Sequence, residues 1–239
     1  MTSPYKKTEQ DRAVSKIIKA LDEKLPDKKA TLLTRDSGGV AIAQPRTVKL
    51  RYKKIVWGIP FDEVCFSKWV VNLLRLNMMP WDSIATTNST YLPEARNTIH
   101  SAFLDTDVEY LAMLDSDVIP PPDFIDRLLA HHLPMVGGWY RKKGEPYNPV
   151  VYDFDHLNEK GIPRYAIRDE PGTGLEKVDA AGAGCWLIHR KVAEAIGKEP
   201  YDMEHGGEDL RMCERVRAAG FEIYIDWSIS CAHTGVAIV

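Results

Sequence analysis

The sequence predicts an α/β fold in which a mixed, mostly parallel β-sheet is flanked by helices. From residue 54 onward, short apolar strand-like runs alternate with amphipathic helical stretches, a pattern typical of right-handed βαβ units. One run, 110–114, is too apolar for an exposed strand and suits a strand buried on both faces of a parallel sheet. It leads directly into Asp115 and Asp117, and ligands of open α/β sheets bind outside the carboxyl ends of such strands.

The composition suits a folded domain of ordinary size. The 239 residues are enough for one domain, or for a domain with an appendage. A hydrophobic fraction of 44% supports a core, and a formal net charge of -3 predicts no general affinity for polyanions. The four cysteines show neither a CxxC pair nor zinc-type spacing, so we expect them to be reduced and mostly buried. Nothing resembles a signal peptide or a membrane span, so the expectation is a cytoplasmic protein.

The chain is expected to divide near residue 50, into an N-terminal segment (1–50) and a main domain (51–239). Apolar residues within 14–25 follow helical spacing and predict an amphipathic helix. Residues 30–48 lack periodicity, contain adjacent glycines and a proline, and are typical of a connector. We expect the helix to pack on the main domain or on a second copy of the chain, which would give a homo-oligomer.

Hydrophobic spacing also predicts individual elements of the main domain. One helical stripe runs from Phe66 to Leu74, and a second helix starts near Pro93, a residue tolerated in a first helical turn. The residues that this second helix is expected to bury are Ala95, Ile99, Ala102 and Phe103. Strands are expected at 55–57, 83–87 and 110–114, followed by less regular strand-like segments at 148–153, 164–168 and 184–188.

Asp115 and Asp117 are candidate metal ligands. Side chains at i and i+2 of an extended chain point the same way, so both carboxylates are expected to leave the strand end on one side. Two acids there form an oxygen-rich site suited to Mg²⁺ or Mn²⁺, which in turn binds phosphate oxygens. The alternative is that both acids shape a turn and cap the helix that follows the prolines at 120–122.

A second acidic pair, Glu208 and Asp209, stands at the start of a predicted helix. The helix dipole and free N–H groups favour negative charge there, so acids are ordinary at such positions. A carboxylate stabilised in this way has a lowered pKa, and Asp209 would act as a general base by position rather than by intrinsic strength. His233 follows the apparent strand 221–225 and is either a ligand or a structural histidine.

Taken together, these motifs resemble the GT-A glycosyltransferases, especially family 2-like enzymes, over roughly residues 54–235. The resemblance lies in the order of four motifs: Asp115-Ser116-Asp117, the glycine-rich strand 181–188, Glu208-Asp209, and His233. It extends to two further tripeptides, Ile59-Pro60-Phe61 and Ala95-Arg96-Asn97. The loop Phe61-Asp62-Glu63 departs from the aromatic residue followed by Asn that family 2 enzymes often carry.

The resemblance implies a GT-A fold with a nucleotide-sugar site and a divalent cofactor, Mn²⁺ or Mg²⁺. Asp117 would ligate the metal with His233 as a further ligand, and Asp115 would face the ribose or a metal-bound water. The residues that would contact the nucleotide are Pro60, Phe61, Arg96, Asp115 and Ser116.

The resemblance also implies the reaction. Gly184, Cys185 and Trp186 would border the sugar and the acceptor. Asp209 would take the proton from the acceptor hydroxyl, with Glu208 holding the acceptor or a loop. The implied activity is the metal-dependent transfer of a single sugar, UDP-linked by family habit, with inversion at the anomeric carbon.

The tract 137–144 combines the aromatic residues Trp139 and Tyr140 with three cations between glycines. Aromatic residues at glycine-flanked turns often stack on sugars, and the cations would meet phosphates. A structural β-turn with exposed lysines is the alternative. The acceptor therefore stays open between a glycan, a small molecule and a modified nucleic-acid base.

Two other classes compete with the glycosyltransferase. A haloacid-dehalogenase-like phosphatase also carries a DxD after an apolar strand, here Asp115 and Asp117, but its nucleophilic Asp follows the first strand of the domain. The non-enzymatic alternative is a nucleotide-sugar-binding module that does not turn over its ligand.

Overall fold

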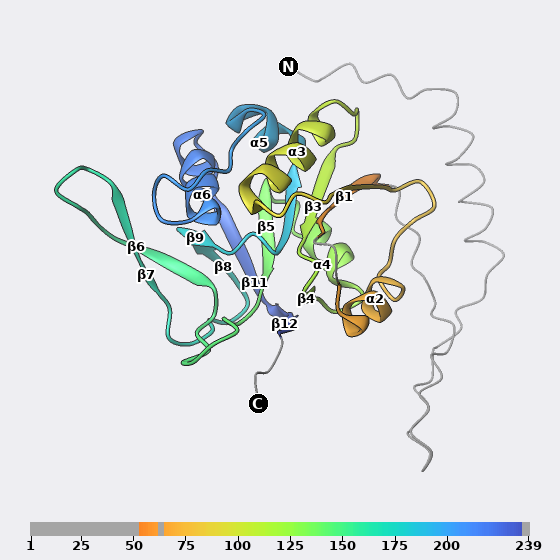
Figure 1. Ribbon diagram of the computed structural model, residues 1–239, viewed down its shortest axis with the longest axis horizontal. Helices are drawn as coiled ribbons and strands as arrows, with labels where there is room; N and C mark the ends of the chain where they lie inside the picture. Colours follow the sequence, from red (N-terminus) through yellow and green to blue (C-terminus); the bar gives the residue numbers. More distant parts are fainter. Residues whose placement is uncertain (1–52, 62–64, 236–239) are drawn as a thin grey trace, which may run out of the picture. The chain divides into compact units, whose positions relative to one another are not determined.

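The computed structural model describes residues 53–61 and 65–235 (Figure 1). The predicted helix within 14–25 and the predicted division near residue 50 lie outside the described residues and stay predictions.

A seven-stranded sheet forms the centre of this domain, in the order β2-β1-β3-β10-β5-β11-β8. β1 pairs in parallel with β2 and β3, and β5 pairs in parallel with β11. β10 lies antiparallel between β3 and β5, and β8 is antiparallel at one edge. Five of the seven strands therefore run in one direction. Their bounds are β1 Ile55–Pro60, β2 Ser83–Thr87, β3 Tyr110–Leu114, β5 Met135–Trp139, β8 Leu175–Val178, β10 Cys185–His189 and β11 Ile223–Ser230.

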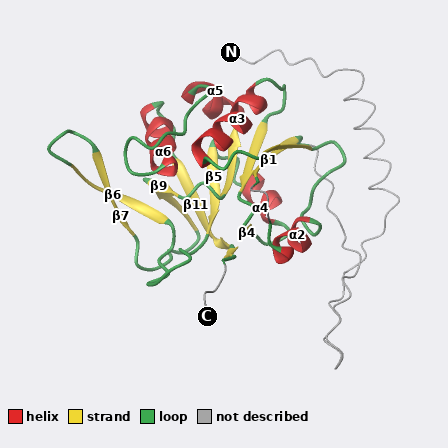
Figure 2. Cartoon of the chain, viewed as in Figure 1, coloured by secondary structure: helices red, strands yellow, loops and turns green. Residues whose placement is uncertain are grey.

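Helices cover both faces of this sheet. α3, α5 and α6 contribute to one hydrophobic cluster and group together in Figure 2, whereas α4 contributes to a second cluster on the opposite face. Alternate residues of the central strands enter the two clusters, as the period of a β-strand requires. The helices are α2 Ser67–Leu73, α3 Leu92–Leu104, α4 Phe124–Ala130, α5 Arg190–Ile196 and α6 Glu208–Ala218.

In the described part of the chain, no helix combines the length and the apolarity that crossing a membrane requires.

Two smaller sheets complete the domain. β6 (Val151–Leu157) pairs with β7 (Pro163–Ile167) as a hairpin and with β9 (Ala180–Ala181) on its other side. β4 (Val118–Ile119) pairs antiparallel with β12 (Ala232–His233). The β4–β12 pair matters for the site, because it places the end of the described chain directly beside the turn that follows β3.

The predicted fold class and the first three strands are confirmed, whereas the apolar residues at helical spacing are buried only in part. In α2, Trp69 is buried, whereas Val70 is 38% and Leu74 82% exposed. In α3, Ala102 is exposed, although Ala95, Ile99 and Phe103 are buried as predicted. α2 has only seven residues, of which Trp69 and Asn72 are buried, so the helical spacing from Phe66 to Leu74 marks more apolar residues than the helix buries.

The interpretation of the 137–144 tract as a glycine-flanked turn is also wrong for its first half. Gly137, Gly138 and Trp139 belong to β5, inside the central sheet. A Cβ atom at Gly137 would lie 2.6 Å from the carbonyl oxygen of Cys185 and 2.6 Å from the ring of Trp186. The glycine therefore allows a close approach of the Trp186 ring to the β5 backbone and does not mark a turn.

This packing predicts the effect of filling the space at Gly137. The substitution Gly137→Ala should lower the free energy of unfolding by about 1–3 kcal/mol, because the added methyl overpacks a rigid part of the core. Gly144→Ala is the matched control, since a Cβ there meets nothing within 4 Å, and its effect should stay within about 0.5 kcal/mol. Urea unfolding of both variants measures this, and equal losses would contradict the close-approach argument.

Candidate active site

The Asp115-Ser116-Asp117 motif forms a turn directly after β3. The Asp115 amide donates to the carbonyl of Gly184 at 3.0 Å, and the Trp69 indole donates to the carbonyl of Asp115 at 2.9 Å. The Val118 amide closes the turn by donating to the same Asp115 carbonyl at 3.2 Å. Because the chain turns here, the extended-strand geometry expected for the two acids does not hold. Neither acid caps α4, whose N-cap residue is Asp123.

Asp115 turns inward and pairs with Arg96. The two terminal nitrogens of Arg96 donate to Oδ1 and Oδ2 of Asp115 at 2.9 and 3.0 Å, a bidentate ion pair. The guanidinium is buried beneath the turn, with the residue 1% exposed. The structure thus places Arg96 away from any surface a nucleotide would reach, and it commits both oxygens of Asp115 to a protein cation.

Asp117 turns toward His233. The short β4–β12 sheet pairs His233 with Val118, and Thr234 donates through its amide and hydroxyl to the Asp117 carbonyl at 2.8 and 2.9 Å. Nε2 of His233 lies 3.5 Å from Oδ1 of Asp117. Burial raises the pKa of Asp117, but the contacts with His233 and Lys143 outweigh it and hold the pKa below its usual range.

The tautomer of His233 follows from its second ring nitrogen. Nδ1 lies 2.8 Å from the backbone carbonyl of Arg141, and because a carbonyl only accepts, Nδ1 carries the hydrogen. Nε2, the other ring nitrogen, faces the Asp117 carboxylate. Metal-binding histidines are commonly oriented in this way, by a hydrogen bond from the other ring nitrogen to a backbone carbonyl.

These residues fit a divalent cation in part. Asp117 and His233 face each other with one oxygen and one nitrogen donor, whereas Asp115 is held by Arg96. Within residues 53–61 and 65–235, no three His, Cys, Asp or Glu side chains gather closely enough to hold a metal by themselves. The arrangement suits a cation such as Mg²⁺, which is usually bound by one or two carboxylates together with substrate phosphates.

Asp209 occupies a different environment from the one expected at a helix start. Its Oδ2 accepts from the Ala183 amide at 3.3 Å, and its Oδ1 is shielded from solvent without a hydrogen-bond partner among the described residues. Burial raises the pKa of Asp209 well above its usual range. The negative charge of Glu208 raises the pKa further, and the attraction of Arg96 lowers it without reversing the shift. The expectation of a lowered pKa is therefore wrong, because burial dominates over the helix dipole.

Glu208 connects the two acidic motifs through Arg96. Its Oε1 lies 3.6 Å from Nε of Arg96, on the other side of the guanidinium from Asp115. A terminal nitrogen of Arg96 also donates to the Ala183 carbonyl at 3.3 Å. One buried cation thus joins α3, the turn after β3, the segment before β10 and the start of α6.

The glycine-rich segment before β10 contributes backbone rather than side chains. A Cβ atom at Gly184 would lie 2.8 Å from Oδ2 of Asp115 and 2.9 Å from the hydroxyl of Tyr140. The absence of a side chain at Gly184 lets the Asp115 carboxylate pack against this segment. Cys185 and Trp186, which follow it, are fully buried in the core, so the structure leaves neither side chain available to a sugar.

The two aromatic residues of the 137–144 tract support the scaffold. Tyr140 is 6% exposed, and its hydroxyl accepts from the Gly184 amide at 3.1 Å. The Trp139 indole donates to the Trp227 carbonyl at 2.8 Å and packs on the Trp227 ring. Both aromatic side chains are thus engaged by neighbouring strands and are not arranged as a platform for sugar stacking.

The predicted base-pocket residues lie at the carboxyl ends of β1 and β3. Pro60 pairs with Thr87 at the end of β1, and the Phe61 ring packs edge-on against Trp69 at 5.3 Å between centroids. Ser116 lies half-buried in the turn after β3. The structure therefore brings these residues to the same edge of the sheet, next to Asp117. The rest of the predicted pocket loop, 62–64, lies outside the described residues.

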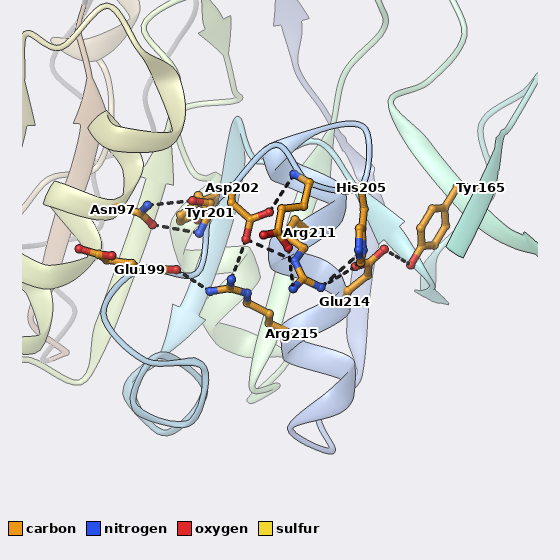
Figure 3. Close-up of polar contacts among 10 residues, drawn as sticks. Asn97, Tyr165, Glu199, Tyr201, Asp202, His205, Arg211, Glu214 and Arg215 are labelled. Atoms are coloured by element: carbon orange, nitrogen blue, oxygen red, sulfur yellow. Dashed lines mark hydrogen bonds and ion pairs between the residues drawn. The ribbon is translucent and has the colours of Figure 1, made fainter. Parts of the chain in front are cut away.

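The segment ahead of α6 is fixed by a polar network that the motifs did not indicate (Figure 3). Asn97, the neighbour of Arg96, forms two hydrogen bonds with the backbone of Tyr201, at 2.8 and 2.9 Å. Asp202 pairs with Arg211 and Arg215 of α6. Only Asn97 had a sequence signal, as part of the Ala95-Arg96-Asn97 tripeptide. The network holds the chain that leads into Glu208 and Asp209.

Comparisons with known proteins bear on the fold. No protein-family model and no curated protein matches the chain. Among solved structures it is similar to the crystal structure of A197 from STIV, with a TM-score of 0.58 and 20% identity over 77% of this chain and 86% of that one. It is also similar to the crystal structure of GalNAc-T7 with UDP, GalNAc and Mn²⁺, with a TM-score of 0.49 and 13% identity over 76% of this chain and 43% of that one.

At 20% identity, the likeness to A197 shows the fold alone. The chain spans less than half the length of GalNAc-T7, and that likeness is too weak to carry an argument. The fold itself is a mixed, mostly parallel sheet flanked by helices, consistent with the Rossmann-like GT-A type.

The raised pKa of Asp209 predicts a pH-dependent cost in stability. The folded protein retains this proton at a pH where the unfolded chain has released it, so wild-type stability falls as pH rises through the folded pKa. Asp209→Asn removes this titration. The variant should therefore gain stability relative to the wild type as pH rises, and the difference in their free energies of unfolding should grow by about 1–3 kcal/mol between pH 4 and pH 9. Urea unfolding across this range measures it, with the exposed Asp107→Asn as control. A difference that does not change with pH would contradict the assignment.

Proposed function

We propose that this protein is a metal-dependent glycosyltransferase that moves a single sugar from a nucleotide-diphosphate sugar, UDP-linked, to an acceptor hydroxyl. The observation that carries the proposal is the meeting of Asp117 and His233, whose Oδ1 and Nε2 lie 3.5 Å apart while Nδ1 of the ring is held by a backbone carbonyl. A carboxylate and an imidazole together at the carboxyl edge of a mostly parallel sheet are suited to share a cation.

Asp117 and His233 are the residues that would hold Mn²⁺ or Mg²⁺. When bound, the cation would neutralise the charge that builds on the departing diphosphate. The nearby Phe61 and Ser116 would border the nucleotide, while the buried Arg96 acts indirectly by fixing Asp115 and hence the turn that carries Asp117.

Asp209 would act as the general base. A carboxylate whose pKa is raised toward the working pH is a stronger base than an ordinary aspartate, and it is still ionised often enough to react. The Ala183 amide fixes the orientation of Asp209 through Oδ2, which leaves Oδ1 to accept the proton of the acceptor hydroxyl. Attack from the side opposite the diphosphate gives inversion. Glu208 would contribute by holding Arg96 in place.

The phosphatase alternative has less support. It needs a free nucleophilic carboxylate after the first strand of the domain, whereas Asp115 follows β3 and has both oxygens bound by Arg96. The acceptor stays open between a glycan, a small molecule and a modified nucleic-acid base.

The metal assignment predicts the effect of removing Asp117. Wild-type protein should bind one donor from a panel of UDP-, GDP-, CMP- and TDP-linked sugars in the presence of Mn²⁺ and lose it in EDTA. Asp117→Ala should weaken Mn²⁺-dependent donor binding at least tenfold, because one ligand and one compensating charge are lost. Isothermal titration calorimetry measures both, with Asp107→Ala as an exposed carboxylate control. Donor binding with unchanged metal dependence in Asp117→Ala would refute the assignment.

The base assignment predicts a separation of binding from turnover. Asp209→Asn should bind the donor as the wild type does, yet hydrolyse it more slowly by a factor on the order of 10² or more, the usual range for a positioned base. Hydrolysis of the bound donor can be measured without knowing the acceptor. A parallel loss of donor affinity would place Asp209 in the nucleotide site instead. Donor binding with no hydrolysis in the wild type would favour a binding module.

A further inference from the structure

Lys143 contacts the carboxylate that the proposed metal would need. Its ammonium group pairs with Oδ2 of Asp117, while Oδ1 of the same carboxylate faces His233. Lys143 and Asp117 are 45% and 25% exposed at their side chains, so the pair lies at the surface of the site. A protein cation thus holds Asp117 in the structure.

The backbone around Lys143 fixes where its ammonium can reach. Residues 141–149 form a closed loop, with a bridge between Arg141 and Pro149 and a hydrogen bond from the Lys142 amide to the Asn148 carbonyl at 2.9 Å. A Cβ atom at Gly235 would lie 3.5 Å from Cδ of Lys143, so the lysine stem runs alongside the chain that follows β12. The loop and the chain after β12 therefore place the stem beside Asp117.

The other two cations of the tract are engaged differently. The Arg141 guanidinium lies over the Trp139 ring at 5.5 Å and donates to the Tyr147 carbonyl at 2.8 Å. Lys142 is exposed, with no carboxylate contact among the described residues. Lys143 is thus the one cation of this tract that contacts a predicted metal ligand, and Lys142 offers a neighbour of the same charge and length as a control.

We propose that Lys143 is an internal counter-ion, which occupies Asp117 in the absence of a divalent cation and moves onto the donor diphosphate when that cation binds. This inference rests on the proposed function. An ammonium and a divalent cation repel each other, so a cation bound at Oδ1 of Asp117 weakens the contact of Lys143 with Oδ2 and favours its release. The flexible four-carbon stem allows the displacement without a change in the backbone. The diphosphate that arrives with the metal supplies a new anionic partner.

The proposal predicts two effects of opposite sign for Lys143→Met. Without nucleotide, the variant should bind Mn²⁺ about 3- to 10-fold more tightly than wild type, because no internal cation competes. With saturating Mn²⁺, it should bind UDP about 3- to 10-fold more weakly, because the diphosphate loses a cation. Calorimetric titration with MnCl₂ alone and then with UDP measures both constants. Lys142→Met, the matched control, should leave both near the wild-type values.

The outcomes are distinguishable. Unchanged or weaker Mn²⁺ binding by Lys143→Met would overturn the competition, and unchanged UDP binding would overturn the transfer to the diphosphate. Either result leaves the proposed function standing if wild-type protein still binds a donor in a Mn²⁺-dependent manner. Absence of Mn²⁺-dependent donor binding in the wild type would instead refute the proposed function, and the inference with it.

Discussion

The buried guanidinium of Arg96 is the interaction on which the candidate site depends. It joins α3 to Asp115 after β3 by a bidentate ion pair, and it lies within 3.6 Å of Glu208 at the start of α6. Removing one partner of a buried ion pair typically costs about 3–5 kcal/mol, because the other charge is left without compensation. The fold is therefore constrained to keep these three segments together, although they lie far apart in the sequence.

The same guanidinium explains why Asp209 is unusual. Three carboxylates, those of Asp115, Glu208 and Asp209, surround one buried cation, and Asp115 takes both terminal nitrogens. Among the described residues, Asp209 accepts a hydrogen bond from the backbone amide of Ala183, and its Oδ1 has no partner. A helix terminus stabilises a carboxylate by about 0.3–1 kcal/mol at an exposed site, whereas burial can move a pKa by several units. Burial therefore decides the direction of the shift.

Local pattern was enough to predict β1, β2, β3, β10 and the start of β11, but it did not predict β5 or β8. The apolar runs that became β1, β2 and β3 alternate with helical stretches, and each signal lies within a few consecutive residues. β5 was missed because Gly137 and Gly138 are typical of a turn in isolation, and only the Trp186 ring packed against them gives them a role in a strand. Likewise, nothing in the sequence near Arg96 indicates that it pairs with Asp115 or lies beside Glu208. Motif order singled out the residues of the candidate site, but their contacts depend on tertiary packing.

The Asp115-Ser116-Asp117 motif illustrates this difference between residue identity and role. Had the chain stayed extended, the two acids would be equivalent ligands on one side of a strand. Because it turns, Asp115 becomes an anchor held by Arg96, and Asp117 becomes the outward carboxylate beside His233 and Lys143. The anchor gives the outward carboxylate a fixed backbone, reinforced from the other side by Thr234. On the proposed function, the motif would supply one rigid ligand, Asp117, rather than two mobile ones, and Asp117 with His233 would leave room for substrate phosphates to complete the coordination of a cation.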